Sequence, residues 1–272
     1  MSEITPLPAA TVTLVRDTAH GLEVLLLQRN HESGFMPGMF LFPGGAVDAG
    51  DAAPEMCERC CGLDERRAGA VLGSTERALA YWAAAIRECF EEAGVLLAYD
   101  AGGAMIGLGG AEARERYAAY RAQLNAGERA FVDVLRAERL QLAVDRLTYF
   151  SHWITPVGAP RRYDTRFFVA AAPGEQDALH DNRETIHHVW MAPGAALDRH
   201  RRGEYKMRSP TVRTLEDFAD YGSAEQLIAA MRERRDIPAI LPRINEQGER
   251  VLPGDPRYEA AARPGAQGKW KP

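Results

Sequence analysis

The sequence has no excess of positive charge and no apolar run long enough to cross a membrane. Its 33 lysines and arginines are outnumbered by 38 aspartates and glutamates, which gives a net charge of −5. Without a global positive field to attract a phosphate backbone, a general nucleic-acid binder is not expected. No uncharged apolar stretch reaches roughly 18 residues, and the N-terminal residues lack a basic segment followed by an apolar one. We therefore expect neither a membrane span nor a secretory signal.

Cysteine is scarce and unevenly placed. Three of the four cysteines, Cys57, Cys60 and Cys61, lie within five residues, and the fourth is Cys89. This spacing is a poor framework for stapling a chain of 272 residues, which favours a reducing compartment, and we expect the cytoplasm. The C-x-x-C-C pattern also invites a zinc interpretation. No second pair at suitable spacing accompanies it, so we interpret these cysteines as plain thiols.

The first half of the chain predicts strands followed by an insertion. Residues 10–16 and 22–28 are rich in Val, Leu and Thr and are separated by a short segment, which predicts a β-hairpin. Residues 30–45 alternate Pro and Gly with apolar residues and predict an ordered loop around one short strand. Residues 52–73 carry the cysteine cluster and many charges. We interpret them as a partly helical insertion.

Later segments predict an α/β fold. A helix is predicted from Ser74, a good N-cap, to Gly94, a residue suited to the left-handed turn after a helix. Further elements are predicted as helices at about 111–125, 128–138, 193–202, 211–220 and 223–234, strands at 148–155, 165–171 and 186–191, and a loose tail at 253–272. This order indicates one mixed sheet between helices, a single domain over residues 1–252, and a lateral helical cap at 111–138.

The strongest chemical signal is the segment AAAIRECFEEAGVLL, residues 83–97. At roughly 100° per residue, its carboxylates, Glu88, Glu91 and Glu92, fall within one arc. The apolar residues nearly opposite that arc are Leu79, Ala83, Ile86, Phe90 and Ala93. Three like charges at this spacing repel one another, and a divalent cation reverses that sign. On the helix alone, however, a solvated acidic face is the commoner explanation.

Together with the sequence upstream of it, this helix resembles the signature of the Nudix hydrolase family. That signature runs Gly, five residues, Glu, seven residues, then Arg-Glu-apolar-x-Glu-Glu-x-Gly-apolar. The matching residues are Gly45 for the first glycine and Arg87, Glu88, Cys89, Glu91, Glu92, Gly94 and Val95 for the second half. The chain departs from the pattern twice, because Asp51 replaces the first glutamate and 35 residues (52–86) replace seven. The role of Asp51 is therefore open.

Split boxes resemble the coenzyme A diphosphatase branch of this family. The flanking motif of that branch is matched here by Leu25, Leu26, Arg29, Gly38 and Phe42 to Gly45, while Leu27, Asn30 and Gly34 depart from it. The strings WITPVGAPRRYDTRFFVA and SPTVRTLEDF also look like this branch. The resemblance spans roughly residues 10–235 and implies an αβα sandwich, a central mixed sheet between helices, with a helical insertion.

What the resemblance implies about chemistry is hydrolysis of a nucleoside diphosphate linked to another moiety. It assigns Glu88, Glu91 and Glu92 as ligands of one to three Mg²⁺ or Mn²⁺ ions. Arg87 pairs with Glu91 one turn on and holds its rotamer. Family members take the general base from the box or from a distant loop. We choose Glu184, in HDNRETIHHVW, with an ordinary loop carboxylate as the alternative.

Phosphate contacts are expected from glycines and arginines. Gly44 and Gly45 would let backbone N–H groups approach the diphosphate, or they only form a turn. Arg29, Arg161 and Arg162 suit phosphate oxygens, such as the 3′-phosphate of coenzyme A, although a single surface arginine is more often solvated. The aromatic residues predicted as core rather than adenine platforms are Trp82, Trp153, Phe167, Phe168 and Trp190. The adjacent His187 and His188 should face opposite sides of a strand.

Three functions remain open on the sequence. The first is a metal-dependent diphosphatase acting on coenzyme A or an acyl derivative. The second keeps the chemistry but takes ADP-ribose or a dinucleotide. The third, of another class, is a Nudix module that senses a nucleotide without cleaving it, against which the intact RECFEEAG run argues. The partner is in each case a small nucleoside-diphosphate molecule, and the oligomeric state is open, with a homodimer as one arrangement.

Overall fold

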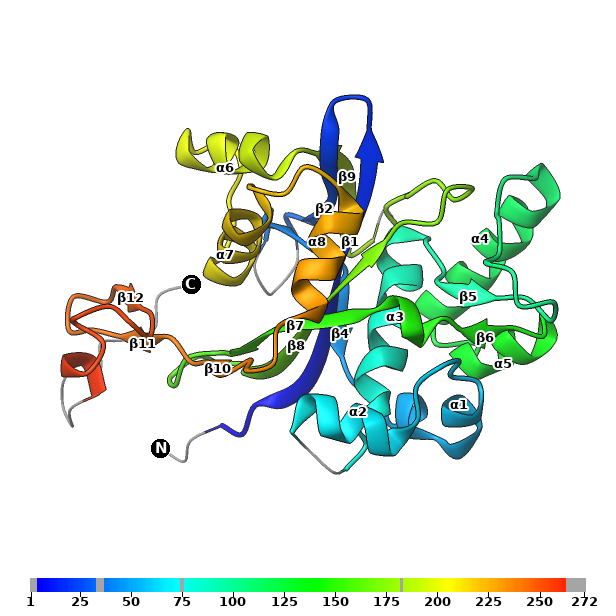
Figure 1. Ribbon diagram of the computed structural model, residues 1–272, viewed down its shortest axis with the longest axis horizontal. Helices are drawn as coiled ribbons and strands as arrows, with labels where there is room; N and C mark the ends of the chain where they lie inside the picture. The colour runs from blue at the N-terminus through cyan, green and yellow to red at the C-terminus, as the bar shows by residue number, and fades with distance from the viewer. Residues whose placement is uncertain (1–3, 33–36, 74–75, 182, 263–272) are drawn as a thin grey trace.

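The computed structural model describes residues 4–32, 37–73, 76–181 and 183–262 (Figure 1). Two long strands open the chain, β1 (Leu7–Thr18) and β2 (Gly21–Arg29), and they pair antiparallel from Val15 opposite Val24 to Thr18 opposite Gly21. Gly21 has φ of 108°, a value that favours glycine at this turn. The predicted hairpin is confirmed.

The central sheet is mixed, as predicted. Its main path runs β10-β7-β8-β1-β2-β3, with β4 on β1 and β9 on β2. The β1–β8 and β10–β7 pairs are parallel, and the other pairs are antiparallel. The remaining strands of this sheet are β3 (Phe40–Leu41), β4 (Gly44–Ala46), β7 (Thr148–Ile154), β8 (Tyr163–Ala171), β9 (Thr185–Met191) and β10 (Ala239–Ile240).

Strands β1 and β2 part at one end of the hairpin. The second half of β1 pairs with β2, whereas its first half pairs with β4, from Ala9 opposite Ala46 to Thr11 opposite Gly44. Strand β2 turns instead to β3 and β9. Two short strands thus stand where one was predicted between residues 30 and 45, and the double glycine lies in the second of them.

Both faces of the sheet are covered by helices (Figure 1). Side chains alternate along the strands, so that Leu14 and Leu25 pack with one helical layer while Val15 and Val24 pack with the other. The first layer holds α1 (Pro54–Glu58), α2 (Glu65–Leu72), α3 (Leu79–Ala93), α4 (Ala111–Asn125) and α5 (Phe131–Ala137); the second holds α6 (Pro193–Arg201), α7 (Ser209–Phe218) and α8 (Ala224–Arg232). The α/β class and the central mixed sheet between helices are confirmed.

The predicted insertion and the predicted lateral cap both pack against α3. Helices α1 and α2 fall within the 52–73 insertion, and a 3₁₀ turn at Ala49–Ala52 precedes them. Phe90 of α3 meets Tyr117 of α4 edge-on at a ring separation of 6.2 Å. A small antiparallel pair, β5 (Ala98–Tyr99) with β6 (Gln141–Leu142), brackets α4 and α5 in the sequence.

Helix α3 is capped differently at its two ends. Gly94 ends it with φ of 70°, as predicted. The predicted N-cap, Ser74, lies outside the described residues. The helix begins at Leu79, and its cap comes from Glu65 of α2, whose carboxylate accepts the N–H groups of Ala78 at 2.6 Å and Leu79 at 3.0 Å. The insertion thus supplies a cap that the cap residue Ala78 cannot form with its own side chain.

The chain ends beyond the sheet with a small hairpin, β11 (Arg243–Ile244) and β12 (Arg250–Val251). Part of the predicted loose tail folds back on it, since the Tyr258 hydroxyl donates to the Leu241 carbonyl at 2.7 Å, and a 3₁₀ turn follows at Ala260–Ala262. Residues 263–272 lie outside the described part. Across that part, each helix is too short or too polar to cross a bilayer.

Candidate active site

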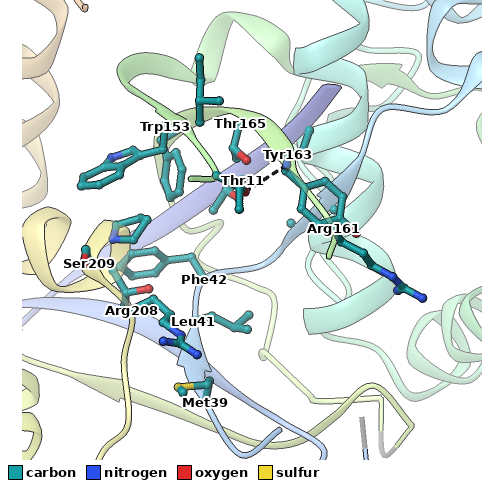
Figure 2. Close-up of a pocket in the computed structure, with 18 of the residues that line it drawn as sticks. Thr11, Met39, Leu41, Phe42, Trp153, Arg161, Tyr163, Thr165, Arg208 and Ser209 are labelled. Carbon is teal, nitrogen blue, oxygen red and sulfur yellow. Dashed lines mark hydrogen bonds between the residues drawn. The ribbon is translucent and has the colours of Figure 1, made fainter. Parts of the chain in front are cut away.

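A cavity of about 590 Å³ lies beside the place where β1 parts from β2 (Figure 2). Glu88 of α3, Gly44 and Gly45 of β4, and the loop residue Glu184 contribute to its wall. Apolar residues make up another stretch of the wall, among them Leu41, Phe42, Trp153 and Phe167. Trp153 and Phe167 are buried, as expected of core residues, yet they also line the cavity. The predicted acidic helix therefore faces a pocket.

Helix α3 is enclosed on both sides, so the solvated-face explanation fails. The apolar residues that the pattern placed together are all buried. The three carboxylates are withdrawn from water as well, with side-chain exposures of 13% for Glu88, 20% for Glu91 and 3% for Glu92. A carboxylate in such surroundings needs partners, because burial disfavours its charge.

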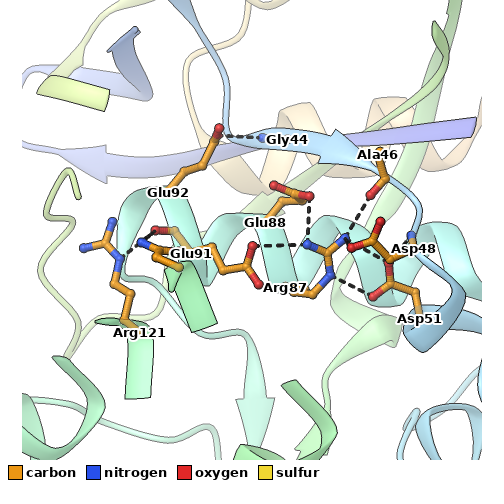
Figure 3. A network of polar contacts seen from close by, with 10 residues as sticks. Gly44, Ala46, Asp48, Asp51, Arg87, Glu88, Glu91, Glu92 and Arg121 are labelled. Atoms are coloured by element: carbon orange, nitrogen blue, oxygen red, sulfur yellow. Dashed lines mark hydrogen bonds and ion pairs between the residues drawn. The ribbon is translucent and has the colours of Figure 1, made fainter. Parts of the chain in front are cut away.

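Arg87 joins the two halves of the split signature (Figure 3). Its Nε and Nη2 atoms donate to the two carboxylate oxygens of Asp51, each at 2.9 Å, and Asp51 is almost completely buried. Its Nη1 atom donates to Glu88 at 2.8 Å and to Glu91 at 3.1 Å. The Ala46 carbonyl accepts a further bond from Nη2 at 2.8 Å. Asp51, whose role the sequence left open, thus pairs with Arg87 although 35 residues separate them.

The double glycine is required by the close approach of α3 to β4. A Cβ atom on Gly45 would lie 2.5 Å from a carboxylate oxygen of Glu88, and one on Gly44 would lie 2.5 Å from the Ala10 carbonyl oxygen. The Gly44 N–H donates to Glu92 at 3.0 Å. That N–H is therefore engaged within the protein here, and Gly44 lines the cavity all the same, so its contact with a diphosphate stays a prediction. Gly45 stays a predicted contact.

Arg29 and Glu184 meet at the same cavity. Arg29 Nη1 donates to Glu184 at 2.6 Å, and its Nη2 lies 3.9 Å from Glu92. The segment holding Glu184 is tied to the end of β2, because the Asn30 N–H donates to the Glu184 carbonyl at 2.8 Å. Glu184 remains half-exposed, with 49% of its side chain accessible. Two residues 155 positions apart were both predicted as functional, and the fold brings them together.

The pKa values of the three α3 glutamates are raised, because burial outweighs the effect of the arginines beside them. Burial raises the pKa of Glu88 to about 7 against the opposing charge of Arg87, and the charge of Glu91 also raises it. Burial also raises the pKa of Glu91. For Glu92, burial raises the pKa, and the charges of Glu88 and Glu184 raise it further. Each carboxylate would be stabilised as an anion by an added cation.

The chemistry of this donor set fits a hard divalent cation. Carboxylate oxygens are the ligands that Mg²⁺ and Mn²⁺ prefer, and three desolvated carboxylates lie together on α3, with Glu88 at the cavity wall. As the described side chains stand, no three acidic, histidine or cysteine residues converge closely enough to enclose an ion. Instead, Arg87 occupies the space between Glu88 and Glu91. A bound ion would thus take over partners that Arg87 now contacts.

The two neighbouring arginines predicted to grip phosphate differ. Arg161 is exposed and lines the cavity. Arg162 is buried, and its guanidinium donates to the Thr155 carbonyl at 3.0 Å and the Ile4 carbonyl at 2.8 Å. Those bonds tie Arg162 to backbone just before β1 and just after β7, and it does not line the cavity, so the prediction of Arg162 as a phosphate ligand is wrong. We withdraw it from the site.

Histidines and cysteines near the predicted motifs have other environments. His187 meets Phe40 edge-on at 6.4 Å, while His188 Nδ1 lies 2.8 Å from His180 Nδ1, so the two adjacent histidines have separate partners. Burial raises the pKa of the Cys57 thiol and raises that of Cys60 to about 12. Such thiols are poorly disposed to ionise.

Sequence reasoning missed several residues of this region. Glu65 caps α3, and the Arg121 Nε atom donates to the Glu91 carbonyl at 2.8 Å. Arg208 and Arg250 line the cavity. The SPTVRTLEDF string begins directly after Arg208, and this neighbourhood is the one signal that pointed to it.

Residues 64–217 match the family model described as the NUDT19 Nudix domain. The chain belongs to the Nudix hydrolase family. The match contains α3 and its glutamates and leaves out Gly45 and Asp51. In this Nudix protein, Arg87 to Glu92 of the second half of the box lie on α3, Gly94 ends that helix, and the Asp51–Arg87 ion pair connects the first half to it.

Relatives support this membership. The chain is 30% identical over 276 residues to the Homo sapiens protein named acyl-coenzyme A diphosphatase NUDT19, covering 88% of this chain and 73% of that protein. It is 29% identical over 282 residues to the protein of the same name from Gallus gallus, covering 87% and 74%. A solved NUDIX hydrolase from Alicyclobacillus acidocaldarius superposes with a TM-score of 0.69 at 28% identity, covering 83% of this chain and 96% of that one.

Proposed function

We propose that this Nudix protein is a metal-dependent diphosphatase that hydrolyses coenzyme A or acyl-coenzyme A. The observation that carries the proposal is the desolvated carboxylate cluster on α3, whose Glu88 lines the cavity and whose Arg87 is paired with Asp51. The named activity of the human and chicken relatives supports the choice of substrate. Cleavage would give a nucleotide and a phosphorylated remainder.

The reaction adds water to one phosphorus of the diphosphate and breaks its bond to the bridging oxygen. Glu88, Glu91 and Glu92 would hold Mg²⁺ or Mn²⁺, which when bound neutralises phosphate oxygens and acidifies water. Arg29 and Arg161, both at the cavity wall, would bind phosphate oxygens, and Gly45 leaves room for their approach.

The general base is proposed to be Glu184, which would take the proton of the attacking water. It lines the cavity, and half of its side chain is exposed. Arg29 holds it at 2.6 Å, so a phosphate that drew Arg29 away would release this carboxylate. Glu88 is the box alternative, since it also lines the cavity. Glu184→Gln distinguishes them, because loss of the base lowers kcat and keeps KM, whereas an unchanged kcat in this variant would favour Glu88.

The test is a substrate panel with product analysis. Purified protein is incubated with Mg²⁺ or Mn²⁺ and, in separate reactions, coenzyme A, an acyl-coenzyme A, ADP-ribose and a dinucleotide. The proposal expects the coenzyme A compounds to be cleaved with the highest kcat/KM. Cleavage of ADP-ribose with coenzyme A left whole would overturn the substrate and keep the chemistry. Binding without cleavage of any compound would favour a sensing module.

Two further properties are proposed on the sequence alone. The cytoplasm is our proposed compartment, because the cysteine pattern suits a reducing environment. A homodimer is the assembly to be tested first, by light scattering at several protein concentrations. A mass that equals one chain of 30.0 kDa at every concentration would exclude it.

A further inference from the structure

The cavity has a second charged region, made of arginines instead of carboxylates. Arg208 and Arg250 both line it. Arg208 directly precedes α7, and Arg250 begins β12, so the two come from distant parts of the chain. Figure 2 places Arg208 beside Met39 and Leu41, while Arg161 lies on the other side with Tyr163. The basic region is thus separate from the position that Arg161 occupies.

Arg208 lies in this wall without a counter-charge from the described residues. Its Nε atom is buried and has no hydrogen-bond partner there, and no described carboxylate forms an ion pair with it. Burial lowers the pKa of Arg208, and the positive charge of Arg250 lowers it further. Burial also lowers the pKa of Arg250. Arg87, by contrast, lies among carboxylates that raise its pKa.

Two guanidinium groups that repel each other at a cavity wall lower their energy by binding an anion. Their planar forks match the oxygens of a phosphate, which carries more charge than a single carboxylate. The first turn of α7 adds to this positive potential, because Ser209 and Thr211 line the cavity and no side chain caps the helix there. A phosphate monoester is therefore the ligand class that fits.

The same cavity is acidic at Glu88 and apolar along Leu41, Phe42 and Trp153. A ligand that spans it would bring a metal-bound diphosphate to the first part, an apolar or flat group to the second, and another anion to Arg208. Coenzyme A is such a molecule, because its nucleotide carries a 3′-phosphate besides the diphosphate. ADP-ribose has no phosphate beyond its diphosphate.

We propose that Arg208 and Arg250 bind the phosphate monoester of the substrate's nucleotide, the 3′-phosphate where the substrate is coenzyme A. The inference rests on the proposed function and deepens it by naming the residues that select the substrate. Arg208 and Arg250 act in binding and do not touch the reacting phosphorus. Their contribution should appear in KM and leave kcat unchanged.

The kinetic test compares coenzyme A with the same molecule lacking its 3′-phosphate. In the wild type, kcat/KM is expected to be roughly 10- to 100-fold higher for coenzyme A than for the dephosphorylated compound. A charged hydrogen-bonded pair typically contributes a difference of this size. Arg208→Gln and Arg250→Gln should each lose most of that ratio through KM and leave the dephosphorylated compound unaffected. Arg208→Lys should keep part of it. The matched control is Arg213→Gln, on the same helix and 58% exposed, where it pairs with Glu216.

A binding test without metal separates this inference from the proposed function. Calorimetry with adenosine 3′,5′-bisphosphate and with adenosine 5′-monophosphate should give tighter binding of the bisphosphate in the wild type, and equal binding in Arg208→Gln. If no diphosphate is hydrolysed but this difference persists, the proposed function fails and the phosphate site stands. Equal binding of both nucleotides by the wild type would overturn the site, even if coenzyme A is cleaved. Because this criterion uses the wild type, a variant that fails to fold leaves the test intact.

Discussion

The two charged ends of the cavity differ in where the counter-charges of their arginines come from. At the α3 end, arginines are already built in among the carboxylates, and Arg87 alone contacts Asp51, Glu88 and Glu91. At the α7 end, Arg208 has another arginine nearby and a buried Nε without a partner. The first end has its counter-charges within the protein, whereas Arg208 at the second has none among the described residues.

This difference indicates which end performs chemistry and which end selects. Catalytic groups must keep their geometry through the reaction, and ion pairs to buried partners provide that rigidity. A selecting group gains most when its counter-charge comes only from the correct ligand, because a substrate without it leaves the arginine unpaired. The α3 end therefore should control kcat, and the α7 end should control KM.

The largest effect is expected from removing charge at the acidic end. Glu91→Gln combined with Glu92→Gln should lower kcat/KM by roughly 10³-fold or more, because two proposed ligands of the cation are lost. Binding of adenosine 3′,5′-bisphosphate without metal should persist, since the α7 end is untouched. Glu112→Gln on exposed α4 is the control, with 96% of its side chain accessible. Turnover retained within tenfold would refute the assignment of ligands.

The next effect is on stability and concerns the split signature. Asp51→Ala removes the bidentate partner of buried Arg87 and should destabilise the fold by about 3 to 5 kcal/mol, as urea unfolding would measure. Glu23→Ala breaks the exposed Arg16–Glu23 pair of 2.7 Å and should cost less than about 1 kcal/mol. Similar losses for both variants would mean that the buried pair does not hold the two halves of the box together.

Local patterns predicted the elements whose signals are local. The hairpin, the end of α3 at Gly94 and the whole of α4 at 111–125 follow from residue periodicity and turn chemistry. The two halves of the box were recognisable in the sequence, because the spacing within each half is intact and Asp51 is the one acidic residue that differs. Arg29 and Glu184 could be singled out separately, but nothing in the sequence stated that they would lie 2.6 Å apart.

What the sequence could not predict depends on contacts between distant segments. The N–H of Gly44 donates to Glu92 across 48 positions, a contact that neither local pattern predicted. Arg161 and Arg162 are adjacent in the sequence, yet one is exposed at the cavity and the other is buried against backbone carbonyls. Whether an arginine can bind phosphate or only bonds to the backbone depends on its burial, and burial is a property of the folded chain.

Metal binding should change stability at the acidic end by a smaller amount. A divalent cation that binds the folded state should stabilise it by about 2 to 3 kcal/mol at an ion concentration near 100 times Kd. Thermal unfolding with MgCl₂ or MnCl₂ and with EDTA measures this. Glu92→Gln should raise the melting temperature in EDTA, because it removes a buried charge, and should reduce the gain with metal. An equal gain in wild type and variant would place the ion elsewhere.

The smallest effect tests how the insertion serves the acidic end. Glu65→Ala removes the acceptor of the Ala78 and Leu79 N–H groups and should cost about 1 to 2 kcal/mol, as loss of a helix cap does. Hydrogen exchange should increase at the first turn of α3 and stay unchanged near Gly94. Glu65→Gln keeps an acceptor and should recover about half of the loss. If exchange rises along the whole helix instead, Glu65 holds α3 in place against the sheet, and kcat should then fall with it.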